Sequence, residues 1–200
     1  MNKIYYTLCA SLLLFSAGLF AENEITDSQT GEKFPSTVSF EEGGKKYDLE
    51  ATGVSTRKKL MFKVYSVASY LEGGLSKDAA NRVQTVLDSD KAKQLSIKWV
   101  RNAEASQITD AYRESLKIAA DGQEAALSKE INQYVSFFNH NISKGEEQVI
   151  RQLPGGVVQV YINGNLAGTI NSEAFAKVLW KIWFGKKSVV NAEQLVSIVK

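Results

Sequence analysis

Histidine and cysteine, the side chains that most often build catalytic and metal centres, are almost absent from this chain. His140 is the single histidine and Cys9 the single cysteine. A lone histidine has no second histidine to complete a zinc site or a proton relay. The adjacent pairs Glu41–Glu42 and Glu146–Glu147 would point to opposite faces of a strand, unlike the facing carboxylates of a glycosidase. No Gly-x-Ser-x-Gly or glycine-rich phosphate motif occurs, so the residues predict no metal and no cofactor.

Two side chains carry donor groups that suit an anion, and what singles them out is a resemblance of the run Ala51–Glu72 to a known family. Arg57 lies in the polar, basic stretch Gly53–Lys59, and its guanidinium offers a planar fork of donors that matches a carboxylate. Tyr65 follows in an apolar stretch and can donate a further hydrogen bond. In a regular strand, residues 57 and 65 share parity and therefore one face, unless a bulge at Lys58–Lys59 breaks the alternation. The alternative is that Arg57 is a solvated turn residue.

The N-terminal residues 1–21 have the order of a secretory signal peptide. Lys3 supplies a positive charge, Leu8–Phe15 is mainly apolar, and Ala21 is a small residue ahead of an acidic stretch. This run is short for a membrane span, and no later stretch is longer and apolar, so no stable membrane insertion is expected after cleavage. We predict a mature chain that begins at Glu22 and is exported to the periplasm. A retained N-terminal anchor is the alternative.

Composition narrows the class of protein further. The chain is 44% apolar and 23% charged, which is ordinary for a globular protein, and its 200 residues fit one domain. Its 24 Lys and Arg and 22 Asp and Glu are spread without blocks, which argues against a nucleic-acid partner. Cys9 would leave with the signal peptide, so the mature chain would hold no disulfide and no thiolate nucleophile. An exported chain without cysteine suits a bacterial periplasm.

The elements that must position Arg57 and Tyr65 follow from hydrophobic periodicity. Residues 22–36 are polar and predict a flexible leader, and residues 37–200 form the folded domain. A hairpin turns at Gly43–Gly44, and later strands turn at Pro154–Gly156 and Asn163–Gly164. Leu60–Leu71 has apolar residues at both parities, which predicts a strand covered on both faces.

Helical patterns fill the rest of the chain. One helix begins after Ser76, a second at Ser106, a third spans Leu127–Phe138, a fourth runs from Ser172 to Gly185 with Trp183 on its apolar face, and a short one follows Asn191. Because hairpins join most of the strands, the order of elements predicts an α+β fold, with an antiparallel sheet packed by a helical layer.

The run Ala51–Glu72 resembles the signature of the chalcone isomerase superfamily, and in particular its bacterial chalcone isomerase-like branch. Further resemblance lies in Gln107–Glu114, Tyr161–Gly164 and Ile182–Gly185, so that it covers about residues 37 to 199. The matching positions in the first run are Gly53, Arg57, Lys59, Phe62, Lys63, Val64 and Tyr65, with Ser55 where a second glycine is usual. The resemblance implies an open-faced β-sandwich: a long antiparallel sheet with helices on one side, a short-stranded sheet below and a ligand cleft.

The family contains both enzymes and non-enzymes, so the resemblance leaves activity open. Of the polar set that lines the cleft in the plant isomerases, only the arginine is matched, by Arg57. Tyr65 replaces one threonine, and the remaining polar positions fall near Ile108, Ser115 and Ile182. The resemblance therefore implies an apolar cavity with one cation and one phenol, as in the family's non-catalytic members that bind fatty acids. The implied ligand-binding residues are Arg57, Tyr65, Ile108, Tyr112 and Ile182.

The expected function is thus that of an exported, non-catalytic protein that binds a fatty acid or a similar amphipathic anion. Two alternatives remain open. One is a periplasmic scaffold whose cleft is filled by its own side chains and which binds a protein partner. The other is an isomerase, an intramolecular lyase, that acts on a phenolic substrate.

Overall fold

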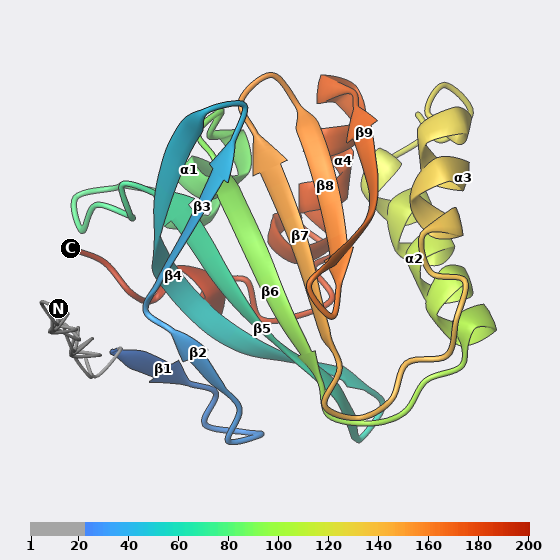
Figure 1. Cartoon of the computed structure of the whole chain (residues 1–200), viewed down its shortest axis with the longest axis horizontal. Helices are drawn as coiled ribbons and strands as arrows, with labels where there is room; N and C mark the ends of the chain where they lie inside the picture. The colour runs from blue at the N-terminus through green and yellow to red at the C-terminus, as the bar shows by residue number, and fades with distance from the viewer. Residues whose placement is uncertain (1–22) are drawn as a thin grey trace, which may run out of the picture.

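An antiparallel sheet of seven strands, ordered β3-β4-β5-β6-β7-β8-β9, occupies the centre of the protein (Figure 1). The computed structural model describes residues 23–200, so the predicted signal peptide over residues 1–21 lies outside the described residues. Each strand pairs with the next one along the chain, as the predicted hairpins require. The strands are β3 (Thr37–Glu42), β4 (Lys45–Lys59), β5 (Phe62–Glu72), β6 (Lys93–Trp99), β7 (Glu147–Leu153), β8 (Val157–Ile162) and β9 (Asn165–Asn171).

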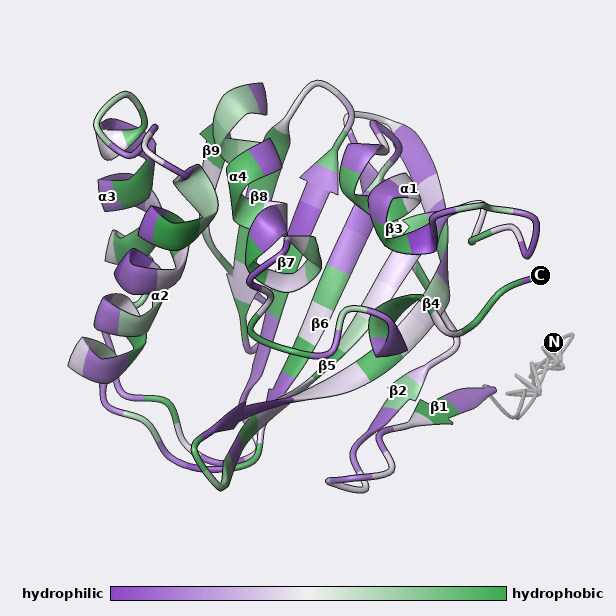
Figure 2. Cartoon of the chain, turned by 180° about the vertical axis from the view of Figure 1, so that it is seen from behind, coloured by the Kyte–Doolittle hydropathy of each residue, from purple (hydrophilic) through white to green (hydrophobic). Residues whose placement is uncertain are grey.

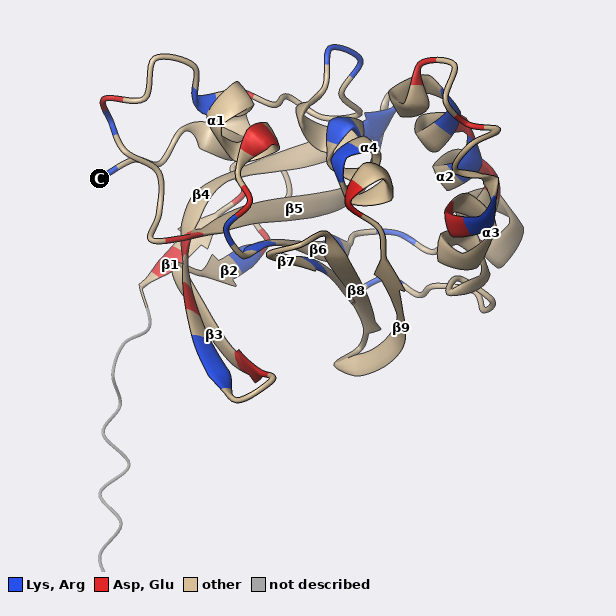
Figure 3. Ribbon diagram, turned by 90° about the horizontal axis from the view of Figure 1, so that it is seen from above, with Lys and Arg blue, Asp and Glu red and all other residues tan. Residues whose placement is uncertain are grey.

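The helices cover one face of this sheet. They are α1 (Arg82–Asp88), α2 (Ala105–Ala120), α3 (Ser128–Ser136) and α4 (Glu173–Phe184), followed by the 3₁₀ turn η1 (Gln194–Val196). Seen from above, the helices lie on one side, and β3 and β9 curl toward the other (Figure 3). A small two-stranded sheet also lies on that open side. The predicted α+β fold, an open-faced sandwich with a helical layer, is confirmed.

Strand β5 is covered on both faces, as its apolar residues at both parities predicted. Val67 and Leu71 pack into the core beneath the helices, where Trp183 is fully buried. Ala68 and Tyr70 pack on the opposite face in a second, smaller core. Figure 2 shows the helix-covered side of the sheet from behind, with hydrophobic residues of α4 in green in front of the strands.

The first and the last of the predicted helices needed correction. The first helix begins after Asn81, whose side chain accepts a hydrogen bond from the amide of Gln84, because the hydroxyl of Ser76 caps only a local turn at Asp78. The segment after Asn191 forms one 3₁₀ turn in place of an α-helix. The predicted cap of α4 is confirmed, since the Ser172 hydroxyl accepts a hydrogen bond from the helix backbone.

The polar stretch Gly53–Lys59, for which the sequence predicted no definite secondary structure, is the second half of β4. Its hydroxyl groups are buried because they find partners: Ser55 donates to the side chain of Gln194 at 2.8 Å. At Gly53 the strand bulges, and a Cβ atom would overlap the backbone carbonyl of Gln194. Glycine therefore allows η1 to pack directly on the strand.

The predicted flexible leader is also wrong, because residues 24–35 form a hairpin of β1 (Glu24–Thr26) and β2 (Lys33–Pro35). Phe34, 1% exposed, packs into the smaller core. Asp27 lies at the start of the connecting turn and is 3% exposed. Its carboxylate accepts hydrogen bonds from the hydroxyls of Thr56 at 2.5 Å and Ser66 at 2.7 Å, which tie the hairpin to β4 and β5. A polar sequence gave no sign of this attachment.

We expect Asp27→Ala to lower the free energy of unfolding by about 1–3 kcal/mol, because it leaves the buried Thr56 hydroxyl without its acceptor. Burial alone would raise the pKa of Asp27, but the hydrogen bonds from Thr56, Ser66 and the Gln29 amide outweigh it and lower the pKa below 3.8. A carboxyl with a lowered folded-state pKa stabilises the protein above its unfolded-state pKa, and this contribution is lost as pH falls through the folded-state value. Urea unfolding at neutral and acidic pH measures both effects.

The difference between wild type and Asp27→Ala should therefore shrink in acid. Asp48 provides a matched control, since its exposed carboxylate also accepts a hydrogen bond from a hydroxyl, that of Ser39. Asp48→Ala should leave stability unchanged. Equal unfolding free energies for wild type and Asp27→Ala at neutral pH would contradict the proposed attachment.

Candidate ligand-binding site

Arg57 and Tyr65 face the same side of the sheet as direct cross-strand partners. Arg57 lies on β4 and Tyr65 on β5, and the antiparallel register pairs them. The irregularity in this register falls between Arg57 and Lys58, beyond the pair, so it does not separate the two side chains. The guanidinium carbon of Arg57 lies 5.9 Å from the centre of the Tyr65 ring. The two share a face, as predicted, although they do so across a hairpin and not along one strand.

A cavity of about 450 Å³ opens beside this pair. It is bounded by the end of the β4–β5 hairpin, by the segment that follows β6, by α2 and by one residue of α4. All five side chains that the sequence singled out line it: Arg57, Tyr65, Ile108, Tyr112 and Ile182. Their role in binding stays a prediction, but the structure brings every one of them to the same cavity.

The half-buried guanidinium of Arg57 forms no ion pair with any described residue. Other charged side chains around the cavity are exposed at its rim. They are Lys59 and Arg101 on one side and Asp110 and Glu114 on α2. Arg57 is thus the least exposed charged residue that lines the cavity, and no described carboxylate occupies its donors.

Tyr65 is held as a neutral hydrogen-bond donor. The indole N–H of Trp183 donates to its hydroxyl oxygen at 3.0 Å, so the proton of the hydroxyl stays available for another acceptor. Burial raises the pKa of Tyr65, although nearby Arg57 and the hydrogen bond from Trp183 oppose this shift. The Tyr65 ring also packs edge-on against Trp99 at 5.4 Å. Side chains of α4 and β6 therefore hold Tyr65 in place.

Tyr112 reaches the cavity from α2 and is anchored in the core. The side-chain amide of Gln148 donates to its hydroxyl at 2.8 Å, and its ring stacks on Phe138 at 4.7 Å. Burial raises its pKa, so it too stays protonated. Ile108 and Ile182, each 3% exposed, form apolar wall.

Several lining residues were not singled out from the sequence. Val64, Trp99, Ala103 and Ala111 add apolar wall, and Leu60 and Phe62 lie at the rim. Val64, Phe62 and Ala111 fall inside the motifs that carry the family resemblance, so that signal was present. Trp99 lines the cavity because it pairs with Tyr65 at the end of β6, and Ala103 lines it because of the path of the chain after β6. The pattern of residues along the sequence contains neither of these relations. The arrangement as a whole can hold a molecule with one anionic end and an apolar body.

Comparisons with known proteins agree with this fold. A crystal structure of a fatty-acid-binding protein from Arabidopsis thaliana aligns with a TM-score of 0.68 at 15% sequence identity, covering 87% of this chain and 96% of that chain. At 15% sequence identity, this structural similarity establishes a shared fold and no more. None of the curated proteins matches the chain by sequence. The sequence model of the family described as "Chalcone isomerase-like" matches residues 26–194. The chain therefore belongs to the chalcone isomerase-like family.

Proposed function

We propose that the protein binds a fatty acid or a similar amphipathic anion in this cavity and does not catalyse a reaction on it. The observation that carries the proposal is the half-buried Arg57, which has no ion-pair partner among the described residues and faces the Tyr65 hydroxyl. A volume of about 450 Å³ falls within the range of small-molecule pockets. The similar Arabidopsis structure, described as a fatty-acid-binding protein, adds support.

The chemistry of the walls fits such a ligand. The Arg57 guanidinium can donate two parallel hydrogen bonds to a carboxylate, and Tyr65, kept protonated, can donate a third. Ile108, Ala111 and Ile182 offer apolar surface to a hydrocarbon chain. Ile108 and Ile182 also stand where the plant isomerases have polar side chains. Because these two buried side chains are apolar and cannot take part in acid–base chemistry, they support ligand binding and not catalysis.

The direct test is to purify the protein without detergent, extract it with organic solvent and identify any bound molecule by mass spectrometry. Calorimetric titration then compares a series of fatty acids with the alcohols of the same chain lengths. We expect the acids to bind and the alcohols to bind much more weakly, because the alcohols lack the carboxylate that Arg57 would recognise. No binding by any acid would favour a scaffold function. Equal binding of acids and alcohols would show that Arg57 does not recognise the head group of the ligand.

We also propose that the chain is exported to the periplasm and begins at Glu22 after cleavage. No helix within residues 23–200 is long and apolar enough to cross a membrane. Intact-mass measurement on protein from the periplasmic fraction should give the mass of the chain from Glu22 to Lys200. Recovery of a mass that includes Met1 would show an uncleaved N-terminal anchor.

A further inference from the structure

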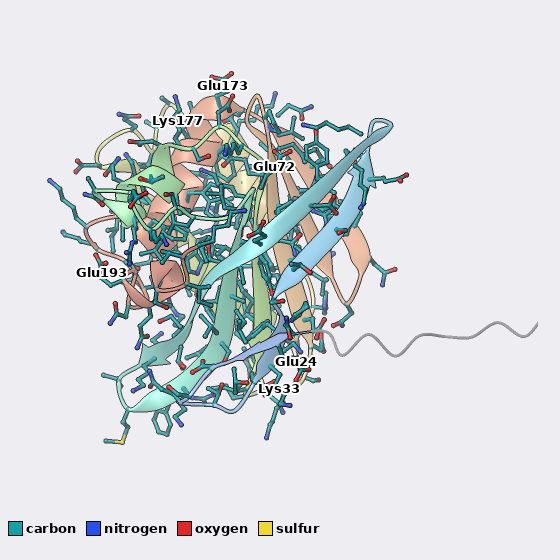
Figure 4. All side chains as sticks on the ribbon, turned by 90° about the vertical axis from the view of Figure 1, so that its left-hand side faces the viewer. Glu24, Lys33, Glu72, Glu173, Lys177 and Glu193 are labelled. Carbon is teal, nitrogen blue, oxygen red and sulfur yellow. The ribbon has the colours of Figure 1, made fainter. Side chains whose placement is uncertain are left out.

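The turn between β4 and β5 exposes three consecutive large apolar side chains. Leu60 is 91% exposed, Met61 84% and Phe62 56%. The other exposed large apolar side chains of the described residues, Ile118, Leu166 and Ile198, are separate from one another in the sequence. The tip of the hairpin projects from the lower left of the molecule in Figure 4, and Figure 2 colours it hydrophobic between hydrophilic strands. We call Leu60–Phe62 the apolar tip.

The backbone of the apolar tip is not the one that these residues favour. Leu60 has a φ of 56°, in the left-handed region that glycine and asparagine adopt at little cost. A leucine there is strained and also leaves its side chain in water. The stability of the fold would be better served by polar residues at this turn. The presence of three apolar side chains there therefore needs an explanation other than folding.

Basic side chains surround the apolar tip. Lys58 and Lys59 precede it, Lys63 follows it, and the Arg101 guanidinium lies 5.1 Å from the centre of the Phe62 ring. No acidic residue occurs between Gly53 and Leu71. None of these four cations forms an ion pair within the described part of the chain. An apolar protrusion with an un-neutralised basic collar has complementary chemistry to an anionic lipid surface.

We infer that the apolar tip docks on anionic phospholipid membranes. Leu60, Met61 and Phe62 insert among the acyl chains, and Lys58 and Lys59 bind lipid phosphates with their stems along the interface. The Lys63 ammonium donates to the Gln29 carbonyl and adds positive charge nearby. Leu60 and Phe62 also lie at the rim of the cavity. Docking therefore places the opening of the cavity against the bilayer, where an amphipathic anion can pass between the two. This loading role rests on the proposed fatty-acid site, whereas docking itself does not.

The test is co-sedimentation with vesicles of phosphatidylcholine and phosphatidylglycerol, and with vesicles of phosphatidylcholine alone. The full chain is expressed, and the N-terminal residue of the purified protein is identified by intact-mass measurement. We expect wild type to bind the anionic vesicles, to bind neutral ones much less, and to dissociate as salt is raised. Met61→Asp and Lys58→Glu should each weaken binding about tenfold or more. Leu166→Asp, which places the same charge on an exposed leucine of β9, should leave vesicle binding unchanged.

Fatty-acid titration without vesicles separates the two proposals, because Met61 and Lys58 do not line the cavity. Both variants should keep the wild-type affinity for a fatty acid in solution. If wild type binds the acid but Met61→Asp binds vesicles as tightly as wild type, docking is overturned and the proposed function stands. Failure of wild type to bind anionic vesicles also overturns docking. If docking depends on Met61 but no acid binds, docking stands and the loading role fails with the proposed function.

Discussion

Replacing Arg57 with alanine is expected to weaken fatty-acid binding by roughly thirtyfold or more, which corresponds to about 2–5 kcal/mol for truncation of one partner of a buried charged pair. The guanidinium is half-buried beside Tyr65 and has no competing carboxylate partner among the described residues. A ligand carboxylate in the cavity would thus lose its principal charge partner. Calorimetric titration of wild type and variant with one long-chain fatty acid measures the effect.

Two milder substitutions test how the carboxylate is held. Arg57→Lys keeps the charge but loses the planar fork, so it should restore only part of the affinity. Tyr65→Phe should cost less than Arg57→Ala, because it removes one neutral donor, worth about 1.5–3 kcal/mol at most toward a charged acceptor. It also removes the acceptor of the Trp183 indole N–H, so its stability must be measured alongside its affinity.

Arg101 is the matched control for charge at the cavity. It lines the same cavity but is exposed, and water screens its interaction with a ligand. Arg101→Ala should therefore lose much less affinity than Arg57→Ala. Circular dichroism should show native folding for all four variants, since none removes core volume other than the single Tyr65 hydroxyl. Equal affinity in wild type and Arg57→Ala would eliminate the carboxylate site.

The fold was predictable wherever burial followed hydrophobic alternation or helical periodicity. Leu60–Leu71 carried apolar residues at both parities, and β5 does have a core on each face. The Asn163–Gly164 turn and the Ser172 cap depend on local chemistry, which a single sequence contains. Elements of this kind need no knowledge of distant contacts.

The errors fell where polar side chains are buried with distant partners. Asp27 and Thr56 are far apart in sequence and bond to each other across the hairpin and the sheet. Ser55 is buried because Gln194, near the other end of the chain, accepts its hydrogen bond. Each of these residues has the appearance of a loop residue until its partner is known, so residues 22–36 were predicted as a flexible leader and Gly53–Lys59 was given no definite secondary structure.

The candidate site was predictable as a set of residues but not as a geometry. The family resemblance drew attention to Arg57 and Tyr65, yet their placement was argued from parity along one strand. The turn at Leu60 and Met61 reverses the chain between them, and cross-strand pairing is what brings them together. The exposed apolar tip could not be foreseen, because Leu60–Phe62 has the composition of a buried strand.

Trp183→Ala is expected to lower the free energy of unfolding by about 3–5 kcal/mol, the usual cost of truncating a large buried aromatic side chain. Trp183 is completely buried on α4 and packs edge-on near Tyr112 at 6.4 Å. Its indole N–H also donates to Tyr65, so the truncation leaves both a cavity and a buried hydroxyl without its donor. Urea unfolding followed by circular dichroism measures the change.

Trp180 allows the volume and hydrogen-bond contributions of Trp183 to be separated. It lies one turn earlier on α4 and is 1% exposed, but its indole N–H has no hydrogen-bond acceptor among the described residues. Trp183→Phe and Trp180→Phe each exchange an indole for a phenyl ring, and only the first removes a hydrogen bond. Trp183→Phe should therefore be the more destabilising by at least about 0.5–1.5 kcal/mol, the net worth of one such bond, because Trp180→Phe also removes a buried N–H without an acceptor. Equal losses would mean that the bond from Trp183 to Tyr65 adds nothing to stability, and that burial of the ring alone holds Tyr65 at the wall of the cavity.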